Sequence, residues 1–68
     1  MNAEARIWQR YAEENERSAE VLLEKRLFNP CLQNAQQAIE KFLKAALVEK
    51  GVPLKRTHSV RELVDMVR

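Results

Sequence analysis

The sequence contains few of the residues that cross-link a chain or interrupt a helix. Among its 68 residues are one cysteine, one glycine and two prolines. A single cysteine, Cys31, excludes an internal disulfide and is typical of a reducing compartment. Because glycine and proline are so sparse, we expect each of them to mark a place where a helix starts or stops.

Long apolar runs and a strong charge of one sign are also missing. No stretch approaches the roughly 18 apolar residues of a transmembrane helix, and Met1–Glu4 lacks the start of a signal peptide. The sequence has twelve Lys and Arg residues and ten Asp and Glu residues, so the net charge is only +2. This charge predicts no strong electrostatic steering of nucleic acid. We therefore expect a cytoplasmic protein with no membrane partner.

The sequence has a single histidine, which limits the chemistry that these residues can perform. His58 has no second metal ligand near it in the sequence, so we predict no metal site. A general acid–base pair needs two groups that converge on one atom, and His58 with the helix-surface Glu40 is not such a pair. We expect no catalytic residue, metal or cofactor in these 68 residues.

Apolar residues recur at helical spacing in three segments. The first runs from Ala3 to about Arg26. We expect Asn29 to cap the second helix with Pro30 as its first residue, and this helix to end near Lys50 before Gly51 in a left-handed turn. We expect the second helix to bury the following residues: Cys31, Leu32, Ala35, Ala38, Ile39, Phe42, Leu43 and Ala46.

The third helix begins at the sequence "SVRE", where Ser59 and Glu62 have the spacing of a capping box. The fold class that these segments predict is all-α, an antiparallel up-down helical bundle in one domain spanning residues 1–68. The apolar face of the third helix is still in mid-pattern at Arg68, so we expect a bundle truncated at its C-terminus. A chain this short lies near the lower limit for a self-sufficient core. We therefore expect a second copy to cover Leu63, Val64 and Val67.

Polar residues in the helices raise the question of a binding site. Asn15 lies in the apolar stripe of the first helix and needs a hydrogen-bond partner such as Gln37, Lys41 or His58. On the second helix, Glu40 and Lys44 have the favourable spacing of an ion pair. They belong to a polar string that is either a solvated helix face or a ligand-facing surface. Its members are Gln33, Gln37, Glu40, Lys41 and Lys44.

Two stretches, "NAQQAIEKFLKAAL" and "THSVRELV", resemble the HEPN (higher eukaryotes and prokaryotes nucleotide-binding) domain family. Members of that family have a second helix of the form A-Q-Q-A-x-E-K-x-L-K-A and a third helix that starts T-H. The resemblance covers about residues 12–67. Asn15 replaces a common Asp and Asn34 a frequent His. RNase members also use an Arg followed, four to six residues later, by His, and this chain has no such pair.

The resemblance implies a four- or five-helix bundle that dimerises, often beside a minimal nucleotidyltransferase in a toxin–antitoxin-like pair. Nucleotide binding, RNA binding or RNA cleavage is the implied activity, and cleavage here would require an Arg–His motif from further sequence. Lysines would neutralise phosphate while amide and imidazole groups orient it. The matching polar residues, which we treat as a candidate nucleotide or RNA site, are Gln37, Glu40, Lys41, Lys44 and His58.

Two hypotheses therefore remain open. One is a HEPN-like domain that associates with nucleotide or RNA and acts as a homodimer or beside a nucleotidyltransferase. The other is a helical protein–protein association module with no ligand of its own, which the small size of the chain favours.

Overall fold

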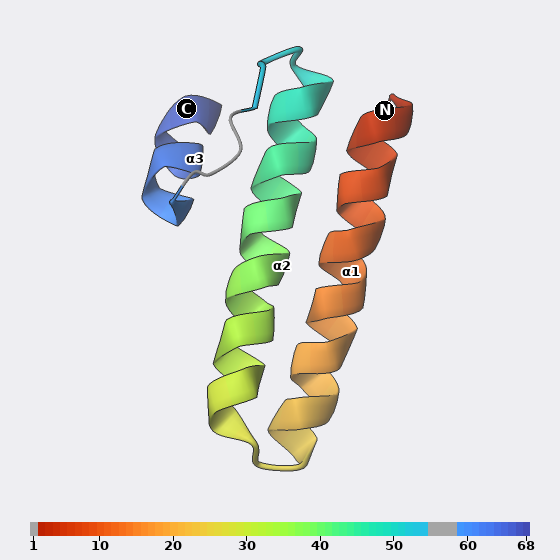
Figure 1. The fold of residues 1–68 in the computed structure, drawn as a ribbon, viewed down its shortest axis with the longest axis vertical. Helices are drawn as coiled ribbons and strands as arrows, with labels where there is room; N and C mark the ends of the chain where they lie inside the picture. The colour runs from red at the N-terminus through yellow and green to blue at the C-terminus, as the bar shows by residue number, and fades with distance from the viewer. Residues whose placement is uncertain (1, 55–58) are drawn as a thin grey trace.

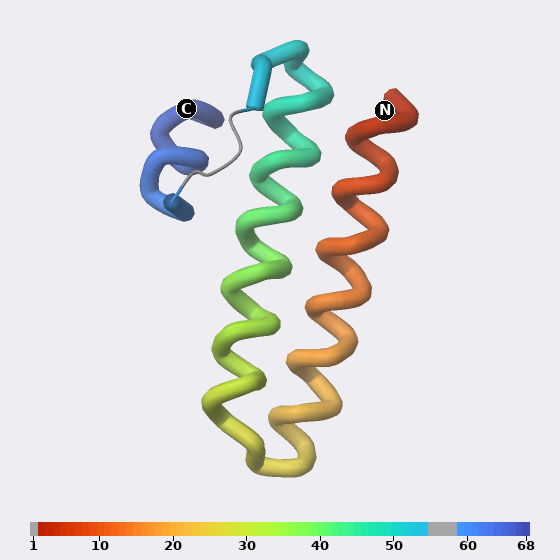
Figure 2. The backbone as a smooth tube through the Cα atoms, in the orientation of Figure 1, coloured from red at the N-terminus to blue at the C-terminus, as the bar shows by residue number. Residues whose placement is uncertain are grey.

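Three helices make up the part of the chain that this computed structural model describes, residues 2–54 and 59–68. Helix α1 spans Ala3–Glu24, α2 spans Phe28–Glu49 and α3 spans Val60–Val67. Within this part, no helix has both the length and the apolar character needed to cross a membrane. Helices α1 and α2 lie side by side and antiparallel, and α3 packs against α2 alone (Figure 1, Figure 2). The all-α prediction is confirmed.

Helix α1 is capped at its start by Asn2, which also ties it to the end of α2. The Asn2 Oδ1 atom accepts a hydrogen bond of 2.7 Å from the backbone N–H of Ala5, as an N-cap side chain does. Its Nδ2 atom donates to the carbonyl of Val48 at 3.3 Å, and its backbone N–H donates to Glu49 Oε2 at 2.9 Å. One residue thus fixes where the first helix begins and which end of the second helix lies beside it.

The seam between α1 and α2 is made of alanine. Each of the buried alanines on the two helices is 9% exposed or less. Small side chains let two helices approach closely, and larger side chains are then displaced to either side of the line of contact. The buried alanines are Ala5, Ala12 and Ala19 on α1 and Ala38 and Ala45 on α2.

The prediction that Leu32, Ile39 and Phe42 are buried is wrong. These side chains are 67%, 51% and 37% exposed, respectively. The apolar side of α2 is broad, and the helix turns the part that carries Ala38 and Ala45 toward α1. The larger apolar residues therefore lie beside the seam instead of inside it.

A second small core forms where α3 packs on α2. Leu47 is half a turn away from Ala38 around α2, so it lies on the side turned from α1, yet it is 0% exposed. Leu63 of α3 is also 0% exposed, so the prediction that a second copy covers it is wrong, because its own chain already buries it. Lys50 Nζ donates to the carbonyl of Val67 at 3.1 Å and fastens the end of α3 to the end of α2.

Helix α2 ends as the sequence predicts, in a Schellman motif. Gly51 has a φ of 77°, the left-handed conformation in which glycine is favoured. The N–H of Gly51 donates to the carbonyl of Val48 at 2.9 Å, and the N–H of Val52 donates to that of Leu47 at 3.0 Å. These two bonds satisfy carbonyl groups that the end of the helix would otherwise leave without partners.

The same motif ends α1, although no glycine marks it. Arg26 has a φ of 60°, and its N–H donates to the carbonyl of Leu23 at 2.9 Å. The N–H of Leu27 donates to the carbonyl of Leu22 at the same distance. In the turn between the two long helices, the left-handed position of the cap is therefore occupied by Arg26, a residue with a Cβ atom, instead of by glycine.

The predicted start of α2 is wrong by two residues. The N-cap is Leu27, with no side-chain hydrogen bond, and Phe28 is the first helical residue. Asn29 and Pro30 lie inside the first turn, where a proline removes no hydrogen bond because the first N–H groups of a helix have no intrahelical acceptor. The tight cap at Arg26 sets the start of α2 more strongly than the side chain of Asn29 does.

Helix α3 begins with the predicted capping box, which is confirmed. Ser59 Oγ accepts from the backbone N–H of Glu62 at 3.1 Å, and Glu62 Oε1 accepts from the backbone N–H of Ser59 at 3.3 Å. This reciprocal pair fixes where the short helix starts.

Candidate functional site

Four of the five predicted site residues lie on α2, and the fifth, His58, lies outside the described residues. Gln37, Lys41 and Lys44 are four and three residues apart, so they share one side of the helix. Glu40 lies on the rim of that side, one turn from Lys44. Gln37 is exposed and the other three are half-buried.

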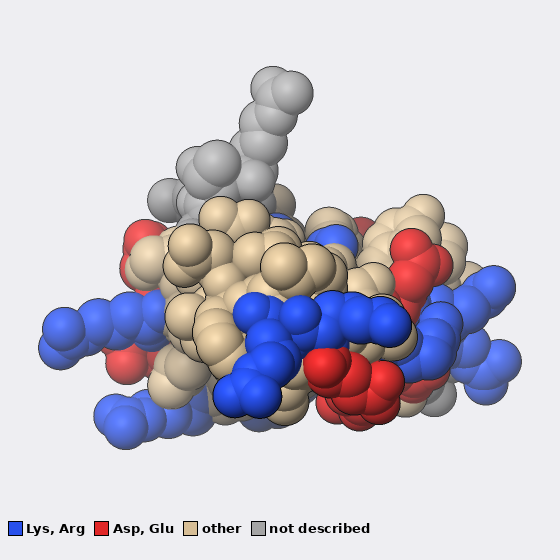
Figure 3. Space-filling view, turned by 90° about the horizontal axis from the view of Figure 1, so that it is seen from below, with Lys and Arg blue, Asp and Glu red and all other residues tan. Residues whose placement is uncertain are grey.

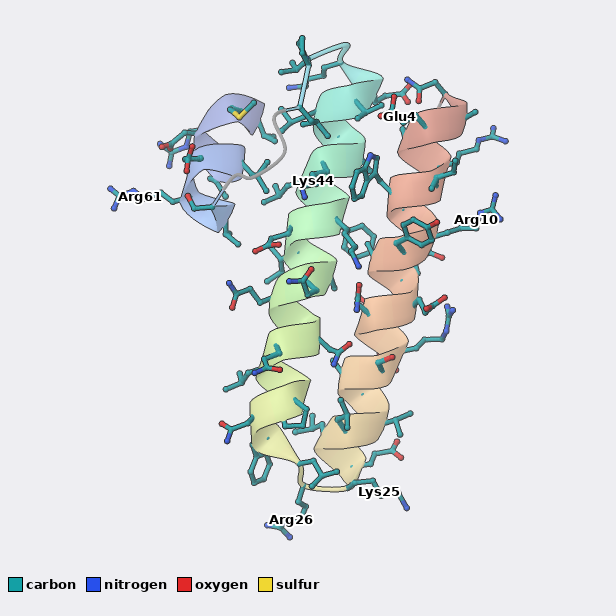
Figure 4. All side chains as sticks on the ribbon, in the orientation of Figure 1. Glu4, Arg10, Lys25, Arg26, Lys44 and Arg61 are labelled. Atoms are coloured by element: carbon teal, nitrogen blue, oxygen red, sulfur yellow. The ribbon has the colours of Figure 1, made fainter. Side chains whose placement is uncertain are left out.

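Lys44 extends toward α1 instead of pairing with Glu40. Its Nζ atom lies 5.0 Å from the ring centroid of Trp8, within the range of a cation–π interaction. Figure 4 labels Lys44 on α2 and shows it near the level of the first turns of α1. The predicted pair with Glu40 does not form in the structure, because the ammonium group contacts the indole.

Lys41 makes the equivalent contact one turn earlier on α2. Its Nζ atom donates to Asn15 Oδ1 at 2.6 Å and lies 5.9 Å from the ring centroid of Tyr11. This confirms that Asn15 finds a partner across the helices, with Lys41 among the three partners that the sequence proposed.

The hydrogen bonds continue from Asn15 to the start of α2. Asn15 Nδ2 donates to Asn34 Oδ1 at 3.0 Å, and Asn34 Nδ2 donates to the carbonyl of Pro30 at 3.0 Å. Both ends of the Asn15 amide are therefore used. Because the chain of bonds joins the two helices at half-buried positions, it fixes their register as well as the orientation of Lys41.

Together these side chains form one surface of the hairpin, which we call the lysine–aromatic face. It combines two ammonium groups, two aromatic rings and three amides. In the sequence, Trp8 occurs at the helical spacing of the apolar stripe and Tyr11 at its edge, so neither ring was predicted to belong to the site. The signal that could have found them is the antiparallel pairing of that stripe with the two lysines. The lysine–aromatic face consists of Trp8, Tyr11, Asn15, Asn34, Gln37, Lys41 and Lys44.

The edge of this face on α1 is hollowed. A depression of about 250 Å³ lies beside Tyr11 and is also lined by Ile7, Arg10 and Glu14. The Tyr11 side chain is 53% exposed, so its ring is accessible from solvent. Arg10, labelled in Figure 4, projects from the outer side of α1 and adds a cation to the lining of this depression.

The arrangement supplies groups that bind and orient a ligand. Ammonium and guanidinium groups attract phosphate, aromatic planes stack on bases, and side-chain amides offer both donors and acceptors. Among residues 2–54 and 59–68, no group of three or more His, Cys, Asp or Glu is placed to hold a metal ion.

Comparison with known families assigns the chain. The model of the HEPN domain family matches residues 5–68, from the first turn of α1 through α3. No curated protein and no solved structure shows significant similarity to the chain. The family match covers nearly the whole chain and agrees with the three-helix architecture. The chain belongs to the HEPN domain family.

Proposed function

We propose that this HEPN domain binds RNA or a nucleotide on the lysine–aromatic face. The observation that carries the proposal is the placement of two lysine ammonium groups over two aromatic rings on one side of the hairpin, 5.0 Å from Trp8 and 5.9 Å from Tyr11. Proteins that bind single-stranded nucleic acid combine cations that follow the phosphates with aromatic side chains that stack on bases.

The two lysines have different parts in this proposal. An ammonium group has three N–H donors, and Lys41 uses one of them on Asn15. Lys44 makes no hydrogen bond within the described residues, and its ammonium group lies 5.0 Å from the centroid of the Trp8 ring, so its N–H donors have no hydrogen-bond acceptor there and can bind phosphate oxygens. Lys44 is therefore the principal phosphate contact, and Lys41 supports it from a fixed position.

The remaining residues contact the nucleoside part of the ligand. The half-exposed ring of Tyr11 stacks on a base at the edge of the face. Gln37 is exposed and offers a donor and an acceptor to a base edge, and Glu40 on the rim accepts from a ribose hydroxyl or a base amino group. His58, which follows from the family resemblance, belongs to the proposed site on that ground alone.

The experiment that tests the proposal compares two lysine variants. We expect Lys44→Ala to weaken binding of a fluorescently labelled single-stranded RNA about threefold to tenfold, and to lower the slope of log affinity against log salt by about one. Lys25→Ala is the matched control, because Lys25 is exposed at the turn between α1 and α2, far from this face (Figure 4).

Fluorescence anisotropy measures the RNA affinity, and the emission of Trp8, the only tryptophan, reports ATP binding independently. Equal losses in Lys44→Ala and Lys25→Ala would indicate general charge attraction and contradict the proposed site. Absence of binding by both RNA and ATP would contradict the proposed function itself.

A second candidate function is association with another protein subunit, either a second copy or a nucleotidyltransferase of a toxin–antitoxin-like pair. The observation that favours it is the apolar surface at the turn end of the hairpin, where Leu27, Phe28 and Leu32 are 52%, 54% and 67% exposed. Figure 3, seen from this end, shows uncharged residues across much of the surface between the Lys and Arg side chains. Exposed apolar clusters of this kind mark interaction sites.

A further inference from the structure

A second depression lies on the outer side of α1, next to the one beside Tyr11. It has a volume of about 460 Å³ and is lined by Ala3, Arg6, Ile7 and Arg10. Ile7 and Arg10 also line the depression beside Tyr11, so the two hollows are continuous. Together they form a shallow groove along the first half of α1 that begins at the edge of the lysine–aromatic face. We call it the arginine groove.

The two arginines of this groove are accessible to a ligand. Arg6 and Arg10 are both exposed, and within residues 2–54 and 59–68 neither guanidinium group makes a hydrogen bond or an ion pair. They are four residues apart, so they lie on the same side of α1, about 6 Å apart along its axis. A guanidinium group binds phosphate oxygens through two parallel N–H donors. Two such groups in a row can therefore hold two successive phosphates of one strand.

The fold gains little from this arrangement. Like charges four residues apart on a helix repel each other and slightly destabilise it. Ile7, which lies between the two arginines, is 44% exposed and so contributes little to the core. A bound chain of phosphates would remove the repulsion and cover the isoleucine.

Charge is distributed unevenly along α1. Residues 3–11 include two arginines and one acid, Glu4, which lies toward the end of α2 instead of in the groove (Figure 4). Residues 12–24 include one arginine and five glutamates. The first of the two hollows ends at one of these glutamates, Glu14. A polyanion is therefore attracted to the first half of the helix and repelled from the second.

Tyr11 connects the groove to the lysine–aromatic face. Its ring centroid lies 5.9 Å from Lys41 Nζ of α2, whereas Arg10 lies on the outer side of α1 (Figure 4). The half-exposed ring thus has a cation in each direction. A nucleotide such as ATP carries all its phosphates on one side of its sugar, whereas a nucleotide within a strand has a phosphate on either side. The cations around Tyr11 fit a nucleotide within a strand.

We propose that the ligand of this site is a single-stranded RNA of about three or more nucleotides, and that its strand runs from the lysine–aromatic face over Tyr11 into the arginine groove. Arg10 and Arg6 bind two successive phosphates there, and Ile7 contacts the ribose or base between them. This inference rests on the proposed function and narrows it, because it selects a strand over a mononucleotide.

Oligoadenylates test the length of the site. Fluorescence anisotropy measures the affinity of labelled chains of one to about six nucleotides. We expect the affinity to rise at least about tenfold between one and about four nucleotides, because only the longer chains reach the groove, and then to level off.

Variants of the two arginines locate the strand. The double variant Arg6→Gln and Arg10→Gln is expected to bind the longest oligoadenylate about tenfold more weakly and to lower the slope of log affinity against log salt by about 1.4. Its affinity for ATP, followed by the emission of Trp8, is expected to stay unchanged. Lys44→Ala, in contrast, weakens the binding of both ligands.

Two cations outside the groove provide the matched control. Arg17 is seven residues after Arg10 on the same side of α1 but lies beyond Glu14, and Lys25 is exposed at the turn end. The double variant Arg17→Gln and Lys25→Gln removes the same charge and is expected to weaken RNA binding by less than about twofold. Circular dichroism checks that each variant folds, and single variants of Arg6 and Arg10 replace the double variant if it does not.

The possible failures of this inference and of the proposed function are distinguishable. An affinity that does not rise beyond a single nucleotide would overturn the inference and leave the proposed function intact. Equal losses in the two double variants would do the same, as would displacement of the RNA by poly-glutamate as effectively as by unlabelled RNA, because both indicate general charge attraction. Absence of binding by ATP and by every oligoadenylate would overturn both.

Discussion

At the scale of single residues, Asn15 connects the fold to the candidate site. Its amide accepts from Lys41 and donates to Asn34, and both bonds cross from α1 to α2. An amide at such a position is tolerated because each of its ends has a partner, and in turn it holds the Lys41 ammonium beside Tyr11. The same residue thus contributes to stability and to the shape of the lysine–aromatic face.

Replacing Asn15 by leucine is expected to lower the free energy of unfolding by about 1 kcal/mol, because Lys41 Nζ and Asn34 Oδ1 lose their partners at half-buried positions. Asn15→Asp is the conservative control, since a carboxylate still accepts from Lys41. Urea denaturation followed by circular dichroism measures both variants. A leucine variant as stable as the unmodified chain would mean that this hydrogen-bond chain contributes nothing to stability.

At the scale of helices, the two Schellman caps differ in one respect. Gly51 has the residue type that a positive φ favours, whereas Arg26 adopts a φ of 60° with a full side chain. A left-handed conformation is unfavourable for a residue with a Cβ atom. The turn that joins α1 to α2 therefore contains local strain that the turn after α2 does not.

Exchanging the residue types at the two caps is expected to change stability in opposite directions. Arg26→Gly raises the free energy of unfolding by about 0.5–1 kcal/mol, and Gly51→Ala lowers it by about 1 kcal/mol. A Cβ atom on Gly51 would have no heavy atom within 4 Å. The loss of stability in Gly51→Ala is therefore expected to come from the backbone conformation, because the added methyl group meets no steric clash. Thermal and urea unfolding check both values, and a destabilised Arg26→Gly variant would contradict the interpretation of the α1 cap.

Features of the helices that depend on local chemistry could be predicted from the sequence. The Ser59 capping box, the left-handed Gly51 and the need of Asn15 for a partner each follow from a few neighbouring residues. The start of α2 could not be predicted in this way. The cap at Arg26 overrides the signal of Asn29 and Pro30, and no glycine in the sequence marks that cap.

The rotation of α2 was beyond prediction for a different reason. Its apolar residues cover more than one side of the helix, so periodicity alone does not say which of them face α1. The alanine seam decides this, because Ala38 and Ala45 permit close approach and Ile39 and Phe42 do not. The two aromatic rings of the candidate site were missed for the same reason. The contacts of Lys41 and Lys44 with these rings can be predicted only when the rotation of α2 is known.

At the scale of the whole molecule, the helices within residues 2–54 and 59–68 leave much apolar surface exposed. Helix α3 covers only one side of α2, and Val64 on α3 remains 37% exposed although Leu63 beside it is buried. The hairpin has a polar side and an apolar side, and its turn end carries Leu27 and Phe28. A single copy of this size therefore has more surface to bury than its own helices cover.

If copies associate, the melting temperature depends on concentration, because association stabilises the folded state by mass action. We expect melting to shift upward by several degrees between about 10 µM and 500 µM protein. Leu27→Ser, at the turn end, is expected to reduce this shift, and Val21→Ser, on the outer side of α1 and 55% exposed, is the control. A melting temperature independent of concentration would exclude self-association over this range.

The proposed function depends on the lysine–aromatic face as the place where a nucleotide or RNA binds. The most direct measurement is a titration of isotope-labelled protein with a short single-stranded RNA, followed residue by residue in amide NMR spectra. We expect shift changes to concentrate at Tyr11, Gln37, Lys41 and Lys44 and to leave the residues around Ile39, on the opposite side of the hairpin, unchanged. Changes concentrated on the Ile39 side of the hairpin, or no changes at saturating RNA, would contradict the proposed function.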